Sequence, residues 1–278
     1  MNVRPLSAFK AIIHVFLVTL GLMLSPASAQ IADVSVQGQT PAMPDMLPWP
    51  LSASLSEPTD RYPHAVLGRI PAFGAMTVTA QLCYGCATPR GMAKLTLPAS
   101  LVFEDVAPRL WDVTGDGRPE IVVVQSHATQ GARLTVWALR DPGDEGAPLF
   151  RMIAATDFIG TRFRWLAPVG MGDFTGDGRT EIAYVETPHL GKTLRLVGLD
   201  GDRLTARGAL SGVTNHRIGE ETIAGGVRTC AGRVEAVLAS ADWRRIMAVG
   251  WQNDALVSRD LGPPSGPQDW DAALLCPR

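Results

Sequence analysis

The chain has 278 residues, of which 46% are hydrophobic and 19% charged, with a formal net charge of −2. This composition suffices for a packed core and excludes an intrinsically disordered chain. The near-neutral charge, without any basic run, argues against nucleic acid and anionic membrane surfaces as partners. The 28 glycines and 21 prolines are typical of a β protein rich in turns.

The N-terminus has the pattern of a targeting segment. Arg4 and Lys10 precede an apolar run from Ala11 to Leu24, and small residues at 27–29 supply a cleavage site. A membrane span needs ~20 apolar residues, more than this run offers. We therefore expect residues 1–29 to be a cleaved signal peptide. The mature chain should have no transmembrane span and should be periplasmic or secreted.

Residues 30–58 read as a linker, because prolines spread along it prevent a continuous helix or a central strand. Within this linker Leu51–Leu55 alternates between apolar and polar residues and predicts one short strand. Such a strand could pair with the last repeat of the chain and close a ring.

The chain has four cysteines, Cys83, Cys86, Cys230 and Cys276. Disulfides persist in exported proteins, and four cysteines allow three pairings. The Cys-x-x-Cys spacing of the first two could form a redox pair. A redox pair usually sits at the start of a helix, whereas residues 87–91 predict a turn, which favours a structural disulfide within a loop. In that case Cys230 would pair with Cys276.

Internal repetition dominates the chain from residue 59 onwards. The run Asp-x-Thr-Gly-Asp-Gly-x-x-Glu-Ile occurs at 112–121 and again, at an offset of 61 residues, at 173–182. A degenerate copy follows at 232–238, and another unit begins near 62–68. Each unit contains short alternating or β-branched runs separated by turn residues, which predict strands. Repeats of this length with about four strands are typical of propeller blades.

The acidic motif resembles the FG-GAP/VCBS repeats of integrin α-subunit propellers and of many bacterial exported proteins. The chain from residue 59 also resembles alphaproteobacterial exported proteins that carry VCBS repeats. The resemblance implies an all-β fold, a β-propeller of about four recognisable four-stranded blades over 59–263, behind the signal peptide and linker and before a tail at 264–278. It also implies that each motif joins the first and second strands of a blade and often holds Ca²⁺. It supports the fold more than any activity.

The spacing of the acidic motif suits a calcium ion, which prefers six to eight oxygen ligands. Positions 1, 3, 5 and 9 offer side-chain oxygens and position 7 a backbone carbonyl. The predicted ligands are Asp112, Thr114, Asp116, Arg118 and Glu120 in the first copy, and Asp173, Thr175, Asp177, Arg179 and Glu181 in the second. The alternative is a plain Asp-Gly turn without an ion. Duplication of the acids favours structural Ca²⁺ in both loops, with modest affinity because threonine occupies position 3. The degenerate copy lacks the paired aspartates, and we expect no ion there.

Two other sets of residues could carry function. Four histidines, His64, His127, His189 and His216, occupy matching places in the repeats. They could bind a transition metal, but hydrogen-bonded turn residues are the favoured interpretation. An exported hydrolase acting on a glycan or an ester could use Glu220 and Glu221 in the insertion at 219–231, or Ser126 with His127. No Gly-x-Ser-x-Gly elbow supports the serine. We therefore predict binding of a protein or an envelope polysaccharide rather than catalysis.

Overall fold

The computed structural model describes residues 48–82, 87, 90–140, 149–266 and 268–276, all within one compact unit that spans residues 31–278. In these residues the fold is all-β, as predicted, with one short C-terminal helix. The predicted signal peptide, the linker up to residue 47, and Cys83 and Cys86 lie outside the described residues. None of the helices in the described part of the chain is long and apolar enough to cross a membrane.

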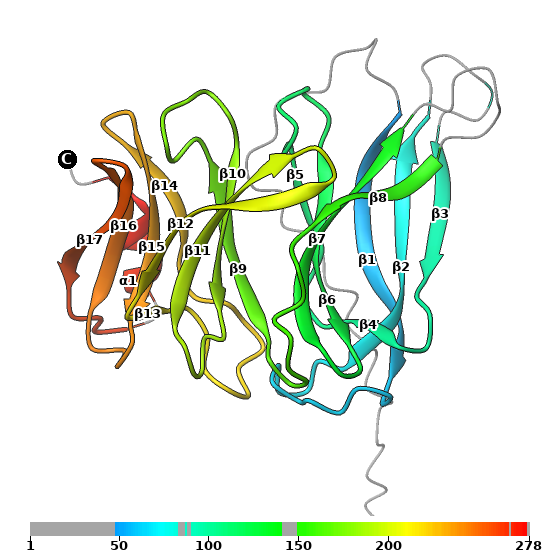
Figure 1. Ribbon diagram of the computed structural model, residues 1–278, viewed down its shortest axis with the longest axis horizontal. Helices are drawn as coiled ribbons and strands as arrows, with labels where there is room; N and C mark the ends of the chain where they lie inside the picture. The colour runs from blue at the N-terminus through cyan, green and yellow to red at the C-terminus, as the bar shows by residue number, and fades with distance from the viewer. Residues whose placement is uncertain (1–47, 83–86, 88–89, 141–148, 267, 277–278) are drawn as a thin grey trace, which may run out of the picture. The chain divides into compact units, whose positions relative to one another are not determined.

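The strands form an N-terminal group followed by three repeats, most of them antiparallel meanders (Figure 1). The N-terminal group contains β1 (Trp49–Thr59), β2 (Ala72–Gln81), β3 (Arg90–Thr96) and β4 (Leu101–Phe103). The first repeat contains β5 (Arg109–Trp111), β6 (Glu120–His127), β7 (Gly131–Arg140) and β8 (Leu149–Ala155). The second repeat contains β9 (Leu166–Gly172), β10 (Glu181–Glu186), β11 (Thr193–Asp200) and β12 (Arg203–Ser211). The third repeat contains β13 (Val213–Thr214), β14 (Gly226–Cys230), β15 (Arg233–Ser240), β16 (Ile246–Gln252) and β17 (Ala255–Gly262).

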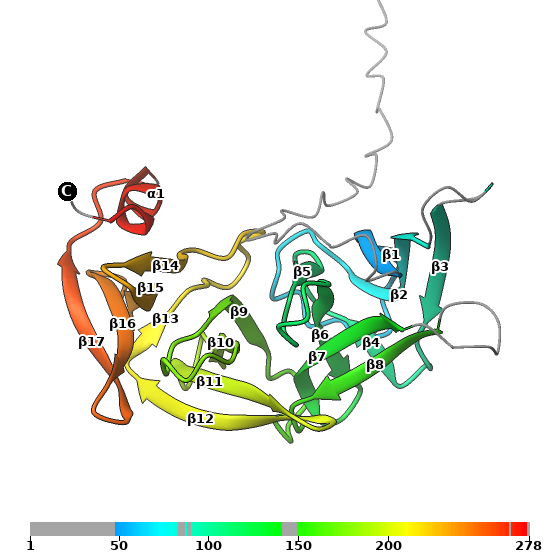
Figure 2. The same cartoon turned by 90° about the horizontal axis from the view of Figure 1, so that it is seen from above.

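The repeats are joined more closely than separate blades would be. Strands β8 and β12 form a parallel bridge between Ala155 and Arg203, and β4 pairs with both β2 and β6. The N-terminal group and the first two repeats therefore share one 12-stranded sheet, while the third repeat forms a 5-stranded sheet (Figure 2). The parallel contact between β8 and β12 is confined to this one residue pair, so the outer strands of the two repeats meet at one point.

The strand expected at 51–55 is part of β1, which pairs with β2 along most of its length. It does not pair with the third repeat, so the expectation that it would complete the last repeat is wrong. The N-terminal group needs β1 because the segment at 62–68, which resembled the start of a repeat, forms turns instead of a strand.

Each hydrophobic core lies between two successive units. Along β6 the side chains alternate, so that Ile121 and Val123 pack toward the N-terminal group while Val122 and Val124 pack toward the second repeat. In β10, Ile182 faces the first repeat and Ala183 the third. Both faces of the first and second repeats are thus buried, which a single four-stranded sheet cannot achieve by itself.

The C-terminal tail is fastened to the third repeat. Helix α1 (Gln268–Leu274) is followed by Cys276, which forms a disulfide with Cys230 at the end of β14. Arg228 donates from Nη1 to the carbonyl of Ala273 at 2.6 Å. The sequence predicts that Cys230 pairs with Cys276 if Cys83 and Cys86 form a structural disulfide. The observed Cys230–Cys276 disulfide is this expected pairing.

Candidate metal centre

The two acidic motifs occupy equivalent loops in the first and second repeats. Residues 112–119 connect β5 to β6, and residues 173–180 connect β9 to β10. Gly117 and Gly178 turn these loops back with φ of 83° and 84°. Such values favour glycine because it has no Cβ. The third repeat replaces this loop with a tight turn at Ala231 and Gly232, consistent with its eroded motif.

The second loop brings three carboxylates together. Single oxygen atoms from Asp173, Asp177 and Glu181 all lie within 4.8 Å of one another. Asp173 accepts hydrogen bonds from the backbone N–H groups of Gly176 at 2.7 Å and Gly178 at 2.9 Å. The aspartate thus shapes the loop and presents its carboxylate to the same place as the other two acids.

Glutamate at position 9 is buried and holds the start of the loop. Glu181 is 1% exposed and accepts from the N–H groups of Phe174 at 2.8 Å and Thr175 at 3.2 Å, and from the Thr175 hydroxyl at 2.9 Å. Glu120, at 0% exposure, accepts from the equivalent groups of Val113 and Thr114. The motif predicted an oxygen ligand here but not this hydrogen bonding. The sequence did carry a signal for these hydrogen bonds. Glu120 and Glu181 each begin a strand and precede a run of apolar residues, and a buried carboxylate needs hydrogen-bond donors nearby.

The arginine at position 7 distinguishes the two loops. Arg118 reaches back within its own loop and places Nη2 2.7 Å from Oδ2 of Asp116. Arg179 leaves its loop and places Nη2 3.5 Å from the carbonyl oxygen of Leu199. The aspartate at position 5 therefore has a guanidinium partner in the first loop. In the second loop the corresponding Asp177 accepts from the backbone N–H of Arg179 at 2.9 Å.

The donor set of the second loop fits a hard divalent cation. Three carboxylates supply oxygen ligands, the type that calcium prefers. Each carboxylate oxygen has more than one lone pair, so an amide hydrogen bond and a metal contact are compatible on one oxygen. Asp173, Asp177 and Glu181 would hold the ion, with Thr175 and the carbonyl of Arg179 as further predicted ligands.

Three of the four histidines converge on Trp165 and Glu104. His64 Nδ1 lies 2.7 Å from Glu104 Oε1, and Trp165 Nε1 donates to the carbonyl of Glu104 at 2.8 Å. His189 lies parallel to the Trp165 ring, and its Nε2 is 2.8 Å from Nδ1 of His216. The Nε2–H of His216 donates to the carbonyl of Glu220 at 2.9 Å. These contacts match the hydrogen-bonded interpretation of the histidines.

His127 lies apart from these three. It accepts from the N–H of Thr129 at 3.2 Å and packs against Phe158.

The residues of the hydrolase hypothesis are engaged separately. Glu221 pairs with Arg69 at 2.7 Å, and Glu220 lies 3.4 Å from Arg217. Ser126 is fully buried and donates its hydroxyl proton to Glu104 Oε2 at 2.6 Å. Each of these side chains thus has an arginine or a carboxylate as its partner.

Comparison with known proteins identifies the repeat. No curated protein matches the chain. A structural match to Sqt1 from Chaetomium thermophilum has 10% sequence identity and a TM-score of 0.32; it covers 64% of this chain and 40% of that one, so the chain spans less than half of that structure. A likeness this low supports no argument about the fold. The profile of the FG-GAP-like repeat matches residues 112–184, from the first acidic loop into β10. The chain therefore carries an FG-GAP-like repeat, as its duplicated motif predicted.

Proposed function

We propose that this chain is an exported β-propeller, stabilised by calcium, that acts as a binding module for an envelope polysaccharide. The observation that carries the proposal is the duplicated acidic loop. It occurs at the same place in two successive repeats, within the FG-GAP-like region, and the second copy gathers three carboxylates. A structural ion site is expected to recur with the repeat, because each repeat has the same loop to fold.

The propeller is supported by the placement of the cores. The first and second repeats each bury one face against the preceding unit and the other face against the following unit, and the third repeat buries one face against the second. This is the packing by which successive sheets of a propeller stabilise one another.

Binding rather than catalysis is supported by how the acids are used. The carboxylates of the two loops accept backbone hydrogen bonds, and the acids of the insertion at 219–231 pair with arginines. A general acid or base needs a side chain that is positioned to exchange a proton with a substrate, whereas these carboxylates are engaged by backbone N–H groups or guanidinium groups. The described residues offer polar loops and shallow cavities, which suit recognition of a polar ligand.

Thermal unfolding in millimolar Ca²⁺ and in chelator tests the calcium proposal. Calcium that binds only the folded chain stabilises it by RT ln(1 + [L]/Kd), about 2.7 kcal/mol at a concentration of 100 Kd. We expect a higher melting temperature with Ca²⁺, a reduced response in Asp173→Asn, and loss of the response in the double variant Asp112→Asn/Asp173→Asn. Asp202→Asn, an exposed acid outside the loops, is the matched control and should keep the response. Identical melting curves with calcium and chelator would contradict the proposal.

Recognition of the polysaccharide is tested by sedimentation of the protein with purified cell-envelope polysaccharide. Binding should saturate and weaken in chelator, since the loops that present the binding surface depend on the ion. Retention on envelope proteins after the polysaccharide is digested would instead favour a protein partner.

A further inference from the structure

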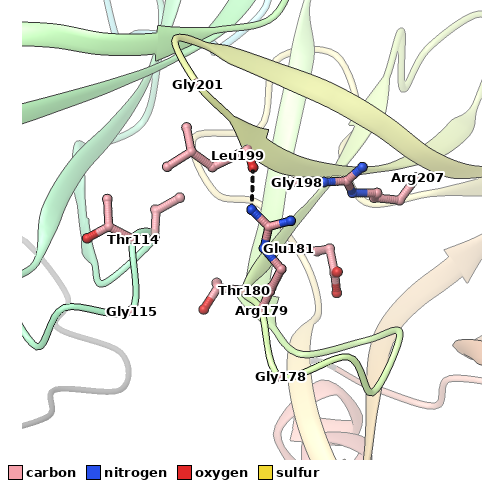
Figure 3. A pocket seen from close by; sticks show the side chains of 11 residues that line it. Thr114, Gly115, Gly178, Arg179, Thr180, Glu181, Gly198, Leu199, Gly201 and Arg207 are labelled. Atoms are coloured by element: carbon pink, nitrogen blue, oxygen red, sulfur yellow. Dashed lines mark hydrogen bonds between the residues drawn. The ribbon is translucent and has the colours of Figure 1, made fainter.

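A cavity of about 280 Å³ lies beside the second acidic loop. Its walls come from the first acidic loop, from the second acidic loop and from the hairpin that joins β11 to β12 (Figure 3). This volume is near the lower end of the ~300–1,000 Å³ typical of ligand clefts. The cavity has the size for one compact chemical unit.

Two arginines reach this cavity from different strands and loops. Arg179 comes from the second acidic loop and Arg207 from β12, and both side chains line the cavity (Figure 3). Arg207 is partly buried, and within the described residues it has no hydrogen-bond or ion-pair partner. The contact of Arg179 with Leu199 is long, at 3.5 Å. Both guanidinium groups therefore have donors to spare.

Glycine at position 198 makes room for Arg207. A Cβ at Gly198 would lie 2.6 Å from Nε of Arg207 and 3.2 Å from its Cζ, so the guanidinium rests directly on the backbone of β11. This contact holds a flexible side chain against the cavity wall. A guanidinium fixed in this way loses less conformational freedom when it binds a planar anion.

The carboxylate in the lining does not neutralise these arginines by direct contact. Glu181 is buried, and its two oxygens accept from the N–H groups of Phe174 and Thr175 and from the Thr175 hydroxyl. The rest of the lining combines the hydroxyls of Thr114 and Thr180 and the backbone of several glycines with two apolar side chains, those of Val113 and Leu199. Two guanidinium groups suit a carboxylate, and hydroxyl and backbone groups around them suit a ligand with several hydroxyls.

We infer that this cavity binds the carboxylate-bearing sugar unit of an acidic polysaccharide, with Arg179 and Arg207 as the carboxylate ligands. The inference rests on the proposed function and names its ligand class. An acidic side chain of a protein would fill the cavity less completely. It would bring one carboxylate but none of the ring hydroxyls that the surrounding polar groups can meet.

Titration calorimetry of the purified protein with glucuronate as the probe tests this inference. Glucose serves as the neutral sugar, inorganic sulfate as a plain anion, and the tripeptide Gly-Glu-Gly as a protein carboxylate. We expect saturable binding of glucuronate that is tighter than that of the other three. If glucose bound as tightly as glucuronate, the arginines would not be carboxylate ligands and the inference would be overturned. Equal or tighter binding of sulfate or of the tripeptide would overturn the assignment of the ligand as a sugar.

Two variants and one control locate the site. Arg207→Gln should weaken glucuronate binding at least about ten-fold, since it removes a charged hydrogen bond. Gly198→Ala keeps the charge but displaces the guanidinium, and it should weaken binding too. Position 198 has no positive φ, so alanine fits the strand itself. Arg203→Gln removes an exposed arginine of the same strand, paired with Asp157, and should bind glucuronate as the unmodified protein does.

Melting curves of the same samples separate this inference from the proposed function. The protein could show calcium-dependent melting and sediment with the polysaccharide, yet not bind glucuronate. That result would overturn the inference and leave the proposed function intact. Unchanged glucuronate affinity in Arg207→Gln also overturns it. Loss of binding in Arg207→Gln and Gly198→Ala, with calcium-dependent melting retained in both, supports it.

Discussion

The first and second repeats share one acidic motif and use it differently. In the first loop the arginine at position 7 pairs with the aspartate at position 5. In the second loop the equivalent arginine turns away to the β11–β12 hairpin, and three carboxylates gather without such a pair. The same acidic motif thus has an arginine of its own beside the position-5 aspartate in the first repeat. In the second repeat its three carboxylates lie together without such an arginine, which suits an external cation. The difference comes from the arginine side chain at position 7, a position that was expected to contribute only its backbone carbonyl to the ion.

The histidines after the second strand of each repeat show a similar divergence. His127 in the first repeat contacts Thr129 and Phe158 near the surface. His189 in the second repeat lies against Trp165 and is hydrogen-bonded to His216. Repetition places a residue at equivalent points of two repeats, but the neighbouring unit decides whether it is buried.

The largest expected effect is one that both repeats should share. Glu120→Ala and Glu181→Ala each remove the acceptor of two backbone N–H groups and a hydroxyl in a buried place. Leaving such donors unsatisfied costs roughly 2–4 kcal/mol of unfolding free energy in each variant. Chemical denaturation measures this cost, and Glu221→Ala, which breaks an exposed pair, should change stability little. If only Glu181→Ala lowered the unfolding free energy, Glu120 would not play the same structural role as Glu181.

The next effect should belong to the second repeat. Burial lowers the pKa of His189 to about 4, with further contributions from the nearby His216, His64 and Lys192. An unfolded histidine titrates near 6.5, so the unfolded chain takes up the proton first as pH falls. The stability from neutral His189 is complete above ~6.5 and is lost as pH falls toward 4.

Melting temperatures between pH 7.5 and 5 measure this loss. The unmodified protein should lose stability as pH falls below ~6.5. His189→Gln should flatten this decline, and His127→Gln should leave it in place. If His127→Gln flattened the decline equally, the proposed contrast between the two histidines would be wrong.

The smallest effect tests the role of arginine at position 7. Arg118→Ala removes the guanidinium from Asp116, so the first loop should gain affinity for calcium. We expect the melting temperature of Arg118→Ala to rise more with millimolar Ca²⁺ than that of the unmodified protein. Arg179→Ala should respond like the unmodified protein, because Arg179 does not pair with the acids of its loop through its side chain. Equal responses in both variants would show that Arg118 does not compete with the ion.

The repeats and their loops could be predicted because they depend on local spacing. The motif at 112–121 and 173–182 located both acidic loops, whereas the tight turn of the third copy was not predicted. Contacts between distant residues could not be predicted in this way. The bridge from Ala155 to Arg203 and the pairing of β1 with β2 depend on which strand edges meet in the folded chain.

The candidate sites divide along the same line. The acids of each loop are close in sequence, so their positions follow from the motif. The cluster around Trp165 joins His64, Glu104, His189 and His216 from the N-terminal group and from the second and third repeats, and no local pattern indicates it. Arg207 also gave no signal, because its place in the cavity depends on a glycine in the neighbouring strand.

The disulfide between Cys230 and Cys276 has a mechanical consequence. Strand β17 is hydrogen-bonded to β16 along its length. Without the disulfide, a pull on the C-terminus would separate β17 from β16 one residue pair at a time. With the cystine in place, tension applied beyond Cys276 passes through the sulfur bridge to the end of β14. Strands β15, β16 and β17 lie within the covalent loop and carry none of this load. The disulfide thus keeps the strands of the last repeat paired when the C-terminus is pulled.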